Sequence, residues 1–304
     1  MKNKPFKNSK YLQTMKYSLF IILFIALGCQ PKEKKGPVEH FPISSDFKNY
    51  WFDGTAELSS YQLTQSRYGS PRVGQAVLIY VTEDFLTKEQ VKANKKSEAS
   101  QLVLKLNKTK KFNTGIYPYS IMTSLFTRLG QTKPLAKITT SVQEWCGQAY
   151  SQLNRKENLE IASHSYFEGE ADEKLSLQEI LTEDEIWNWI RTQPDQLPLG
   201  TLEILPSFEY IRLKHKPIKP YKAEGSLEKT NEHNTFHLTY PELNRQLSIS
   251  FSKEIPHEIM GWEEKNLKNP DQITTAKRIK TLKLPYWTLN NLGDERFRDS
   301  LGLK

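Results

Sequence analysis

The sequence predicts a mainly β protein, built as an antiparallel curved sheet, an open barrel or a sandwich with one or two short helices. Two observations favour this class. Short segments in which apolar and polar residues alternate recur from residue 49 onward, and the clearest has Leu247, Ile249 and Phe251 separated by serines. Only one segment has strong helical periodicity, and no regular alternation of strands with helices indicates parallel βαβ units.

The first two strands are expected to form a long hairpin. Residues 50–65 and 73–84 flank Arg67-Tyr68-Gly69-Ser70-Pro71, a cluster of turn-forming residues. Residues 76–81 are all apolar, which predicts a central strand that is covered on both faces.

Residues 86–99 are polar and predict a loop or one short helix. Pro118 cannot donate a hydrogen bond to a neighbouring strand, so its segment is expected at an edge or to leave the sheet there. A loss of alternation near Thr281 suggests a β-bulge. Further strands are expected at residues 102–107, 116–124, 135–145, 158–166, 208–213, 236–240, 247–251 and 279–284, and a short helix at 294–301.

The clearest helix begins after Thr182. Thr182 and Glu185 have the spacing of a capping box, and Pro194 ends the run. Its tryptophans are expected to pack on a sheet. Residues 168–185 hold eight acidic residues whose spacing does not match a calcium loop, so we expect a solvated acidic loop. Residues 47–304 are expected to form one β-rich domain, with two β halves split near residues 168–198 as the alternative.

The N-terminal residues are typical of a secretory signal. Five lysines precede residues 17–28, an uncharged run that is too short for a bilayer core, which needs about 20 residues. Ala26-Leu27-Gly28-Cys29 resembles the lipobox of bacterial lipoproteins. This resemblance implies cleavage after residue 28, acylation of Cys29 and anchoring to a membrane through the lipid. Residues 29–46 are then expected to be a flexible tether.

Gln30 and the basic residues after it favour an outer-membrane lipoprotein that faces the periplasm, with surface exposure as the alternative. Without residues 1–28 the chain has 38 basic and 35 acidic residues. This balance gives no electrostatic reason to expect nucleic acid as a partner. Cys146 is then the one cysteine besides Cys29, and we expect it to be buried, as free cysteines usually are.

Familiar catalytic motifs are absent from the sequence. It has no H-E-x-x-H pair, no phosphate-binding glycine loop and no G-x-S-x-G elbow, so we expect no metal and no cofactor. Cys146 stands beside Trp145, and His164 is the nearest downstream base, which makes an envelope hydrolase the alternative hypothesis.

The strongest candidate for a binding surface is the basic and aromatic segment from residue 108 to residue 119. Lys110, Lys111, Tyr117 and Tyr119 are its candidate ligand-binding residues, suited to an envelope protein, a lipid or a glycan. The alternative is an ordinary solvated turn beside a packed edge strand.

Residues 50–58, 111–119 and 143–148 carry a resemblance that spans most of the chain after Cys29. The sequence resembles a family of Bacteroidota lipoproteins labelled "septum formation inhibitor Maf". True Maf proteins are nucleotide pyrophosphatases of α/β fold with a Ser-Pro-Arg-Arg motif, whereas here Val73 follows Ser70-Pro71-Arg72 in an expected turn. We therefore interpret the label as a misannotation. The resemblance itself implies no established activity.

The sequence thus favours a lipid-anchored envelope protein with a binding or scaffolding role. A hydrolase that uses Cys146 and His164 is the first alternative, and a Maf-like nucleotide pyrophosphatase is the second.

Overall fold

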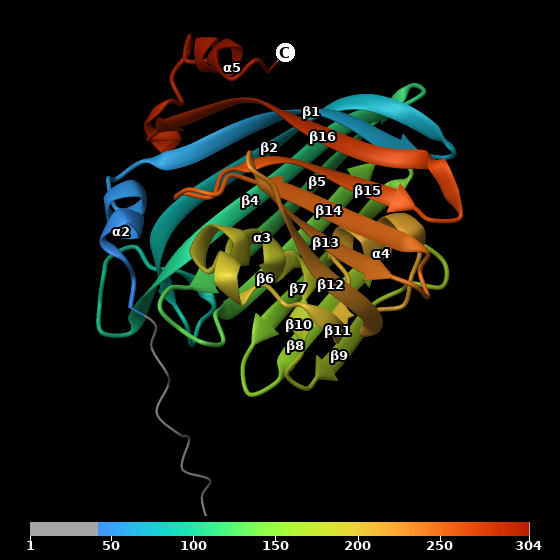
Figure 1. Cartoon of the computed structure of the whole chain (residues 1–304), viewed down its shortest axis with the longest axis horizontal. Coiled ribbons are helices and arrows are strands. Elements are labelled where there is room, and N and C mark those ends of the chain that lie inside the picture. Colours follow the sequence, from blue (N-terminus) through green and yellow to red (C-terminus); the bar gives the residue numbers. More distant parts are fainter. Residues whose placement is uncertain (1–41, 304) are drawn as a thin grey trace, which may run out of the picture. The chain divides into compact units, whose positions relative to one another are not determined.

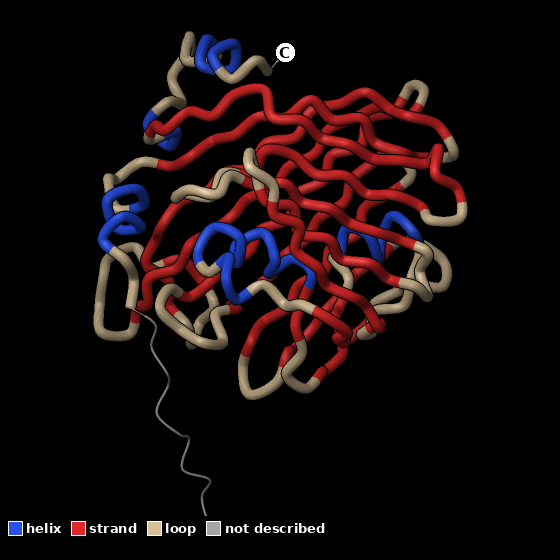
Figure 2. Tube along the Cα trace, in the orientation of Figure 1, coloured by secondary structure: helices blue, strands red, loops and turns tan. Residues whose placement is uncertain are grey.

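One strongly curved sheet of 16 strands contains every strand of the part of the chain that the structure describes. The structure is a computed structural model and describes residues 42–303. The expected signal peptide, Cys29 and residues 29–41 of the expected tether lie outside the described residues. The spatial order runs from β10 through β11–β16 to β1, β2 and β4–β9, with β3 paired to β2 (Figures 1 and 2).

The strands are β1 (Ala56–Arg67), β2 (Ser70–Leu86), β3 (Val91–Lys92), β4 (Ser100–Thr114), β5 (Tyr117–Arg128), β6 (Leu135–Glu144), β7 (Gly147–Arg155), β8 (Leu159–Ser165), β9 (Glu173–Leu177), β10 (Leu181–Thr182), β11 (Gly200–Leu205), β12 (Tyr221–Lys229), β13 (Asn234–Tyr240), β14 (Arg245–Phe251), β15 (Ile259–Asn266) and β16 (Asn269–Leu284). The helices are α2 (Ser45–Trp51), α3 (Glu183–Thr192), α4 (Phe208–Lys214) and α5 (Arg296–Ser300), with 3-10 turns at Pro194–Gln196 and Tyr286–Thr288.

The sheet curls without closing. All neighbouring strands are antiparallel except the two-residue β10, which pairs parallel to β11. The two end strands, β9 and β10, follow one another in the chain but are not paired. The predicted mainly β fold with an antiparallel curved sheet is therefore confirmed.

Tyr68 and Gly69 have positive φ and form the tight turn that the sequence predicts between β1 and β2.

Strand β2 has side chains covered on both faces of the sheet. Leu78 and Tyr80 are fully buried on the inner face. On the outer face, Val77 and Ile79 belong to a small apolar cluster with two leucines from the C-terminal end of the described chain, at positions 301 and 303. The predicted central strand is confirmed.

Helices α3 and α4 lie in the concave side of the sheet and belong to its main core (Figure 1). The rings of Trp187 on α3 and Trp262 on β15 meet edge to face, with their centroids 5.2 Å apart. The packing of the helical tryptophans on the sheet is therefore confirmed. The capping box is also present, since the Glu185 carboxylate accepts hydrogen bonds from the backbone N–H and the hydroxyl of Thr182, each at 3.0 Å.

Replacing Thr182 with alanine is expected to lower the free energy of unfolding by about 0.5–2 kcal/mol, because α3 loses part of its N-terminal cap. Urea unfolding of the fragment 40–304, followed by tryptophan fluorescence, measures the change. Thr201→Ala, at an exposed threonine of β11, is the control and should change the stability by less than about 0.5 kcal/mol. Equal losses of unfolding free energy in the two variants would contradict the assignment of Thr182 as the N-terminal cap of α3.

Two expectations about secondary structure are wrong. Residues 208–213 form helix α4 and not a strand, because Ser207 caps the segment by accepting a hydrogen bond from the Tyr210 N–H. Helix α2 occupies the end of the expected tether and the start of the expected first strand, and Ser44 caps it in the same way through Phe47. The described residues hold four short helices, whereas one or two were expected.

Two finer expectations are confirmed, and a third is met only in part. The register of β1 on β16 shifts between Ser60 and Tyr61, which leaves Ile279 as the extra residue of a bulge close to Thr281. Strand β5 is not an edge strand, because it pairs with both β4 and β6, but Pro118 itself pairs with β4 alone, since the pairing with β6 begins only at Ser120. Helix α5 lies within the expected range 294–301.

Antiparallel pairing places alternate connections at opposite ends of the strands. The connections at residues 67–70, 114–117, 144–147, 240–245 and 266–269 all fall at one end of the sheet, which we call the turn rim. The end of α4 leads into β12 at the same rim. Helix α2 precedes the opposite end of β1, so the chain enters the sheet at the other rim (Figure 1).

Candidate functional site: a basic cleft at the turn rim

The concave side of the sheet contains charged side chains as well as apolar ones. Lys108 and Lys110 continue the inward-facing positions of Leu104 and Leu106 on β4, and all four are buried. Both lysines form ion pairs with Glu209 of α4, at 3.4 and 2.6 Å. Burial alone would raise the pKa of Glu209, but the two ammonium groups hold it at about 2.

A second buried group connects α3 with β14 and β15. The guanidinium of Arg245 donates to both carboxylate oxygens of Glu183, at 2.5 and 2.8 Å, and to Glu264 at 2.6 Å. The Tyr240 hydroxyl also donates to Glu183, at 2.8 Å. The positive charge of Arg245 is therefore balanced by carboxylates, although its buried Nε has no hydrogen-bond partner among the described residues. The ion pair with Glu183 fixes the start of α3 against the sheet.

The predicted solvated acidic loop is wrong for its last three residues. Glu183, Asp184 and Glu185 are buried in the first turn of α3, where backbone N–H groups favour negative charge. Asp184 accepts a hydrogen bond from the Phe208 N–H at the start of α4, at 3.4 Å. Burial raises the pKa of Asp184 to about 6 and that of Glu185 to about 7.

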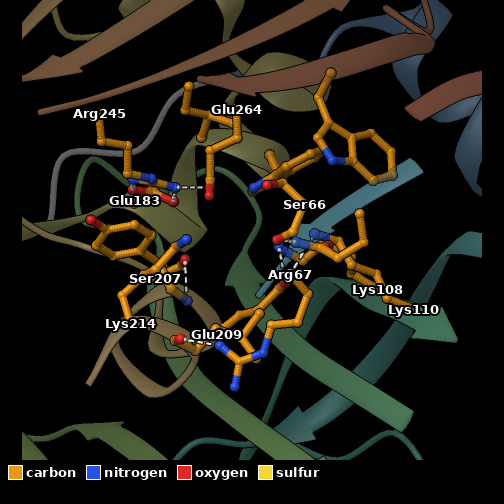
Figure 3. A pocket seen from close by; sticks show the side chains of 16 residues that line it. Ser66, Arg67, Lys108, Lys110, Glu183, Ser207, Glu209, Lys214, Arg245 and Glu264 are labelled. Atoms are coloured by element: carbon orange, nitrogen blue, oxygen red, sulfur yellow. Dashed lines mark hydrogen bonds and ion pairs between the residues drawn. The ribbon is translucent and has the colours of Figure 1, made fainter. Parts of the chain in front are cut away.

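Two adjoining hollows open among these groups at the turn rim, and together we call them the basic cleft. The inner hollow is about 20 Å³ and is drawn in Figure 3, and the outer hollow is about 230 Å³. They share Ser66, Tyr210, Lys214, Arg245 and Glu264. Seven basic residues line the cleft: Arg67, Lys108, Lys110, Lys214, Lys216, Arg245 and Lys265. Three acidic residues line it: Glu183, Glu209 and Glu264.

Arg67 is the buried cation of the cleft that has no carboxylate partner among the described residues. Its side chain projects from the end of β1, and the residue is only 9% exposed. The guanidinium donates to the Leu213 carbonyl at 2.5 Å and to the hydroxyls of Tyr68 and Tyr119 at 3.3 and 3.1 Å. Its Nε is buried and has no hydrogen-bond partner within residues 42–303. A buried cation is normally paired with an anion, so this site is suited to an anionic group.

Lys214 and Lys216 lie on the outer side of the cleft, at the end of α4. Both are exposed, and within the described range neither ammonium group has an ion-pair partner. Lys265 differs, because it pairs with Glu263 at 2.5 Å. The two free lysines therefore add positive charge at the mouth of the cleft.

The predicted ligand-binding residues are divided between the two faces of the sheet. Lys110 lines the cleft, and Tyr119 is buried against Phe112 with its hydroxyl on Arg67. Lys111 is exposed on the outer face, because successive residues of a strand point to opposite sides, and Tyr117 lies half-buried at the turn rim.

No pattern in the sequence identified Arg67, Arg245, Glu209 or the lysines at the end of α4 as site residues. One usable signal was present, because Lys108 and Lys110 fall on the inward phase of β4 and therefore require buried acidic partners.

Cys146 is exposed, so the expectation that it is buried is wrong. It lies in the turn between β6 and β7, and interaction with the Glu144 side chain raises its pKa. A thiol nucleophile requires the opposite shift. The His164 imidazole contacts Asp172 at 3.2 Å, and no hydrogen bond joins His164 to Cys146 in the described part of the chain. The geometry gives no support to a hydrolase built on this pair.

Within residues 42–303, no three side chains among His, Cys, Asp and Glu lie grouped as a metal site would need. No helix in this range has the length and apolar character needed to cross a membrane.

Comparison of the chain with protein-family models and with curated proteins finds no match. Among solved structures, the chain is similar to the crystal structure of a β-barrel-like protein of the domain of unknown function DUF1849 from Brucella abortus. The TM-score is 0.47 and the sequence identity is 7%, with 75% of this chain and 98% of the other chain covered.

Proposed function

We propose that this chain is a lipid-anchored protein of the cell envelope that binds an anionic group, a phosphate or a carboxylate, in the basic cleft. The sequence around Cys29 supports the lipid anchor. The single observation that carries the binding role is Arg67, a buried guanidinium that meets only neutral oxygens within the described residues.

The size of the two hollows limits how a ligand binds. The inner hollow has room for about one water molecule, whereas the outer hollow is roughly ten times larger. The ligand therefore places its anionic group in the outer hollow, beside Lys214 and Lys216, and the rest of the molecule remains at the surface. Arg67 attracts the ligand from the inner hollow through its positive charge.

Replacing Lys214 and Lys216 together with alanine is expected to weaken anion binding about 5–30-fold, which corresponds to about 1–2 kcal/mol for two partly solvated charge contacts. Neither side chain supports the fold, so stability should not change. The probes are inorganic phosphate and monomeric dihexanoylphosphatidylglycerol, titrated into the fragment 40–304 and followed by calorimetry. Raising the salt concentration should weaken binding of both probes.

The matched control replaces Lys222 and Lys229 with alanine. These lysines are exposed on β12 outside the cleft, so the change in net charge is the same. Binding of phosphate alone would indicate a free anion as ligand, and binding of the lipid alone would indicate a headgroup. The proposal fails if neither probe binds, or if the control double variant loses as much affinity as the cleft variant.

A further inference from the structure

Large apolar side chains project from neighbouring hairpin turns of the turn rim. Tyr68 lies between β1 and β2, Ile116 lies between β4 and β5, and Trp145 lies between β6 and β7, while Tyr117 is the first residue of β5. Ile116 is 85% exposed, Trp145 is 68% exposed and Tyr68 is 61% exposed. We call these four residues the tip patch.

The members of the tip patch are neighbours in space. The rings of Tyr117 and Trp145 lie 6.5 Å apart, and the rings of Tyr117 and Tyr119 lie 6.0 Å apart. The Tyr68 and Tyr119 hydroxyls are 3.0 Å apart, and both contact Arg67 of the basic cleft. The tip patch and the cleft therefore adjoin at one rim.

We infer that the turn rim docks on a lipid bilayer surface, with the tip patch inserted at the level of the headgroups and the basic cleft on an anionic headgroup. This inference rests on the proposed function, because it names a membrane lipid as the source of the anion. Tryptophan and tyrosine favour the interface between hydrocarbon and water. Transfer of an apolar side chain such as that of Ile116 from water into this interface lowers the free energy of the system.

The shape and charge of the rim favour a bilayer over a protein partner. The apolar side chains stand on separate turn tips, whereas the residues that dominate protein interfaces are enclosed in packed pockets. Lys214 and Lys216 add positive charge beside the patch, and anionic headgroups would complement it. Beyond Trp145, the loop between β8 and β9 contains the acidic residues Glu168, Glu170 and Asp172. We place the limit of the docking surface at this acidic loop.

The test uses the fragment 40–304, which holds the whole sheet and its core in one compact unit. Cys29 is absent from this fragment, so no acyl chain contributes to binding, and Cys146 beside Trp145 is its one thiol. An environment-sensitive fluorophore on Cys146 reports insertion into vesicles of phosphatidylethanolamine and phosphatidylglycerol at roughly 7:3, with pure phosphatidylcholine vesicles as the uncharged comparison. Co-sedimentation measures the partition coefficient independently of the label.

The expected result is that the fragment partitions onto the anionic vesicles and that the fluorescence emission of the fluorophore on Cys146 shifts to shorter wavelength. The double variant Ile116→Ser, Trp145→Ser should partition at least tenfold more weakly. The control double variant Leu199→Ser, Leu292→Ser also removes two exposed apolar side chains, but away from the turn rim, and should stay within twofold of the unmodified fragment.

The inference is overturned if the unmodified fragment does not partition onto the anionic vesicles, or if the tip variant partitions as well as the control. Titration with monomeric dihexanoylphosphatidylglycerol separates this failure from failure of the proposed function. If the lipid monomer binds in a way that depends on Lys214 and Lys216 but the fragment does not bind vesicles, the docking surface is contradicted and the anion site is supported. If neither vesicles nor the lipid monomer bind, the docking surface is contradicted, and the anion site is contradicted as well if inorganic phosphate also fails to bind.

Discussion

Replacing Glu57 with glutamine is expected to lower the free energy of unfolding by about 3–5 kcal/mol, since it leaves the buried Arg191 guanidinium without its counter-charge. Glu57 is fully buried on β1, and Arg191 of α3 is 2% exposed. Arg191 donates to the two oxygens of Glu57 at 2.7 and 2.5 Å, and the Tyr50 hydroxyl donates to Glu57 at 2.6 Å. Burial would raise the pKa of Glu57, but Arg191 holds it below its usual value. Urea unfolding of the fragment 40–304 measures the loss.

The informative control removes both charges. Glu57→Leu combined with Arg191→Met replaces the buried ion pair with apolar side chains of similar size, and such replacements are often neutral or stabilising. We expect the double variant to recover most of the stability that Glu57→Gln loses. A loss below about 1 kcal/mol in the single variant would show that the pair is not enclosed as the structure describes.

Local patterns in the sequence predicted much of the fold. The serines between Leu247, Ile249 and Phe251 identify a half-buried strand because strand alternation needs no distant partner. The same holds for the turn at Tyr68 and for the capping box at Thr182. The segment 208–213 was predicted wrongly, because its residues are buried all round in the concave side of the sheet and show no amphipathic pattern.

The candidate site was predicted only in part. Lys110 and Tyr119 were identified because they belong to the basic and aromatic segment 108–119, without any prediction of their partners. Their partners lie far along the chain, since Lys110 pairs with Glu209 across 99 positions and Tyr119 with Arg67 across 52. Which residues meet in the concave side depends on the register of the whole sheet, and no local pattern specifies that register.

The stability of the protein is expected to fall as the pH rises from about 4 to about 7, because Asp184 and Glu185 must ionise while buried. Their pKa values of about 6 and about 7 lie above those of the unfolded chain, so the folded state holds these protons more tightly. The stabilisation is complete at a pH below the pKa values that the two carboxyls have in the unfolded chain. It is lost as the pH rises through the pKa values that they have in the folded protein. Each carboxyl contributes up to about 3 kcal/mol to this decline, since one pKa unit corresponds to about 1.4 kcal/mol. Below about pH 4 the trend reverses, because Glu57, Glu183 and Glu209 have lowered pKa values and become protonated.

The double variant Asp184→Asn, Glu185→Gln tests this expectation, because neither amide ionises and the side-chain carbonyl introduced in place of the Glu185 carboxylate can still accept a hydrogen bond at the cap. The difference in unfolding free energy between the variant and the unmodified fragment 40–304 should increase in favour of the variant between about pH 4.5 and about pH 7. Taking this difference cancels the other groups that titrate in the same window, among them His257, whose pKa burial lowers. A difference that stays constant with pH would mean that these two carboxyls are already ionised at about pH 4.5, and that the start of α3 is more accessible to water than its burial indicates.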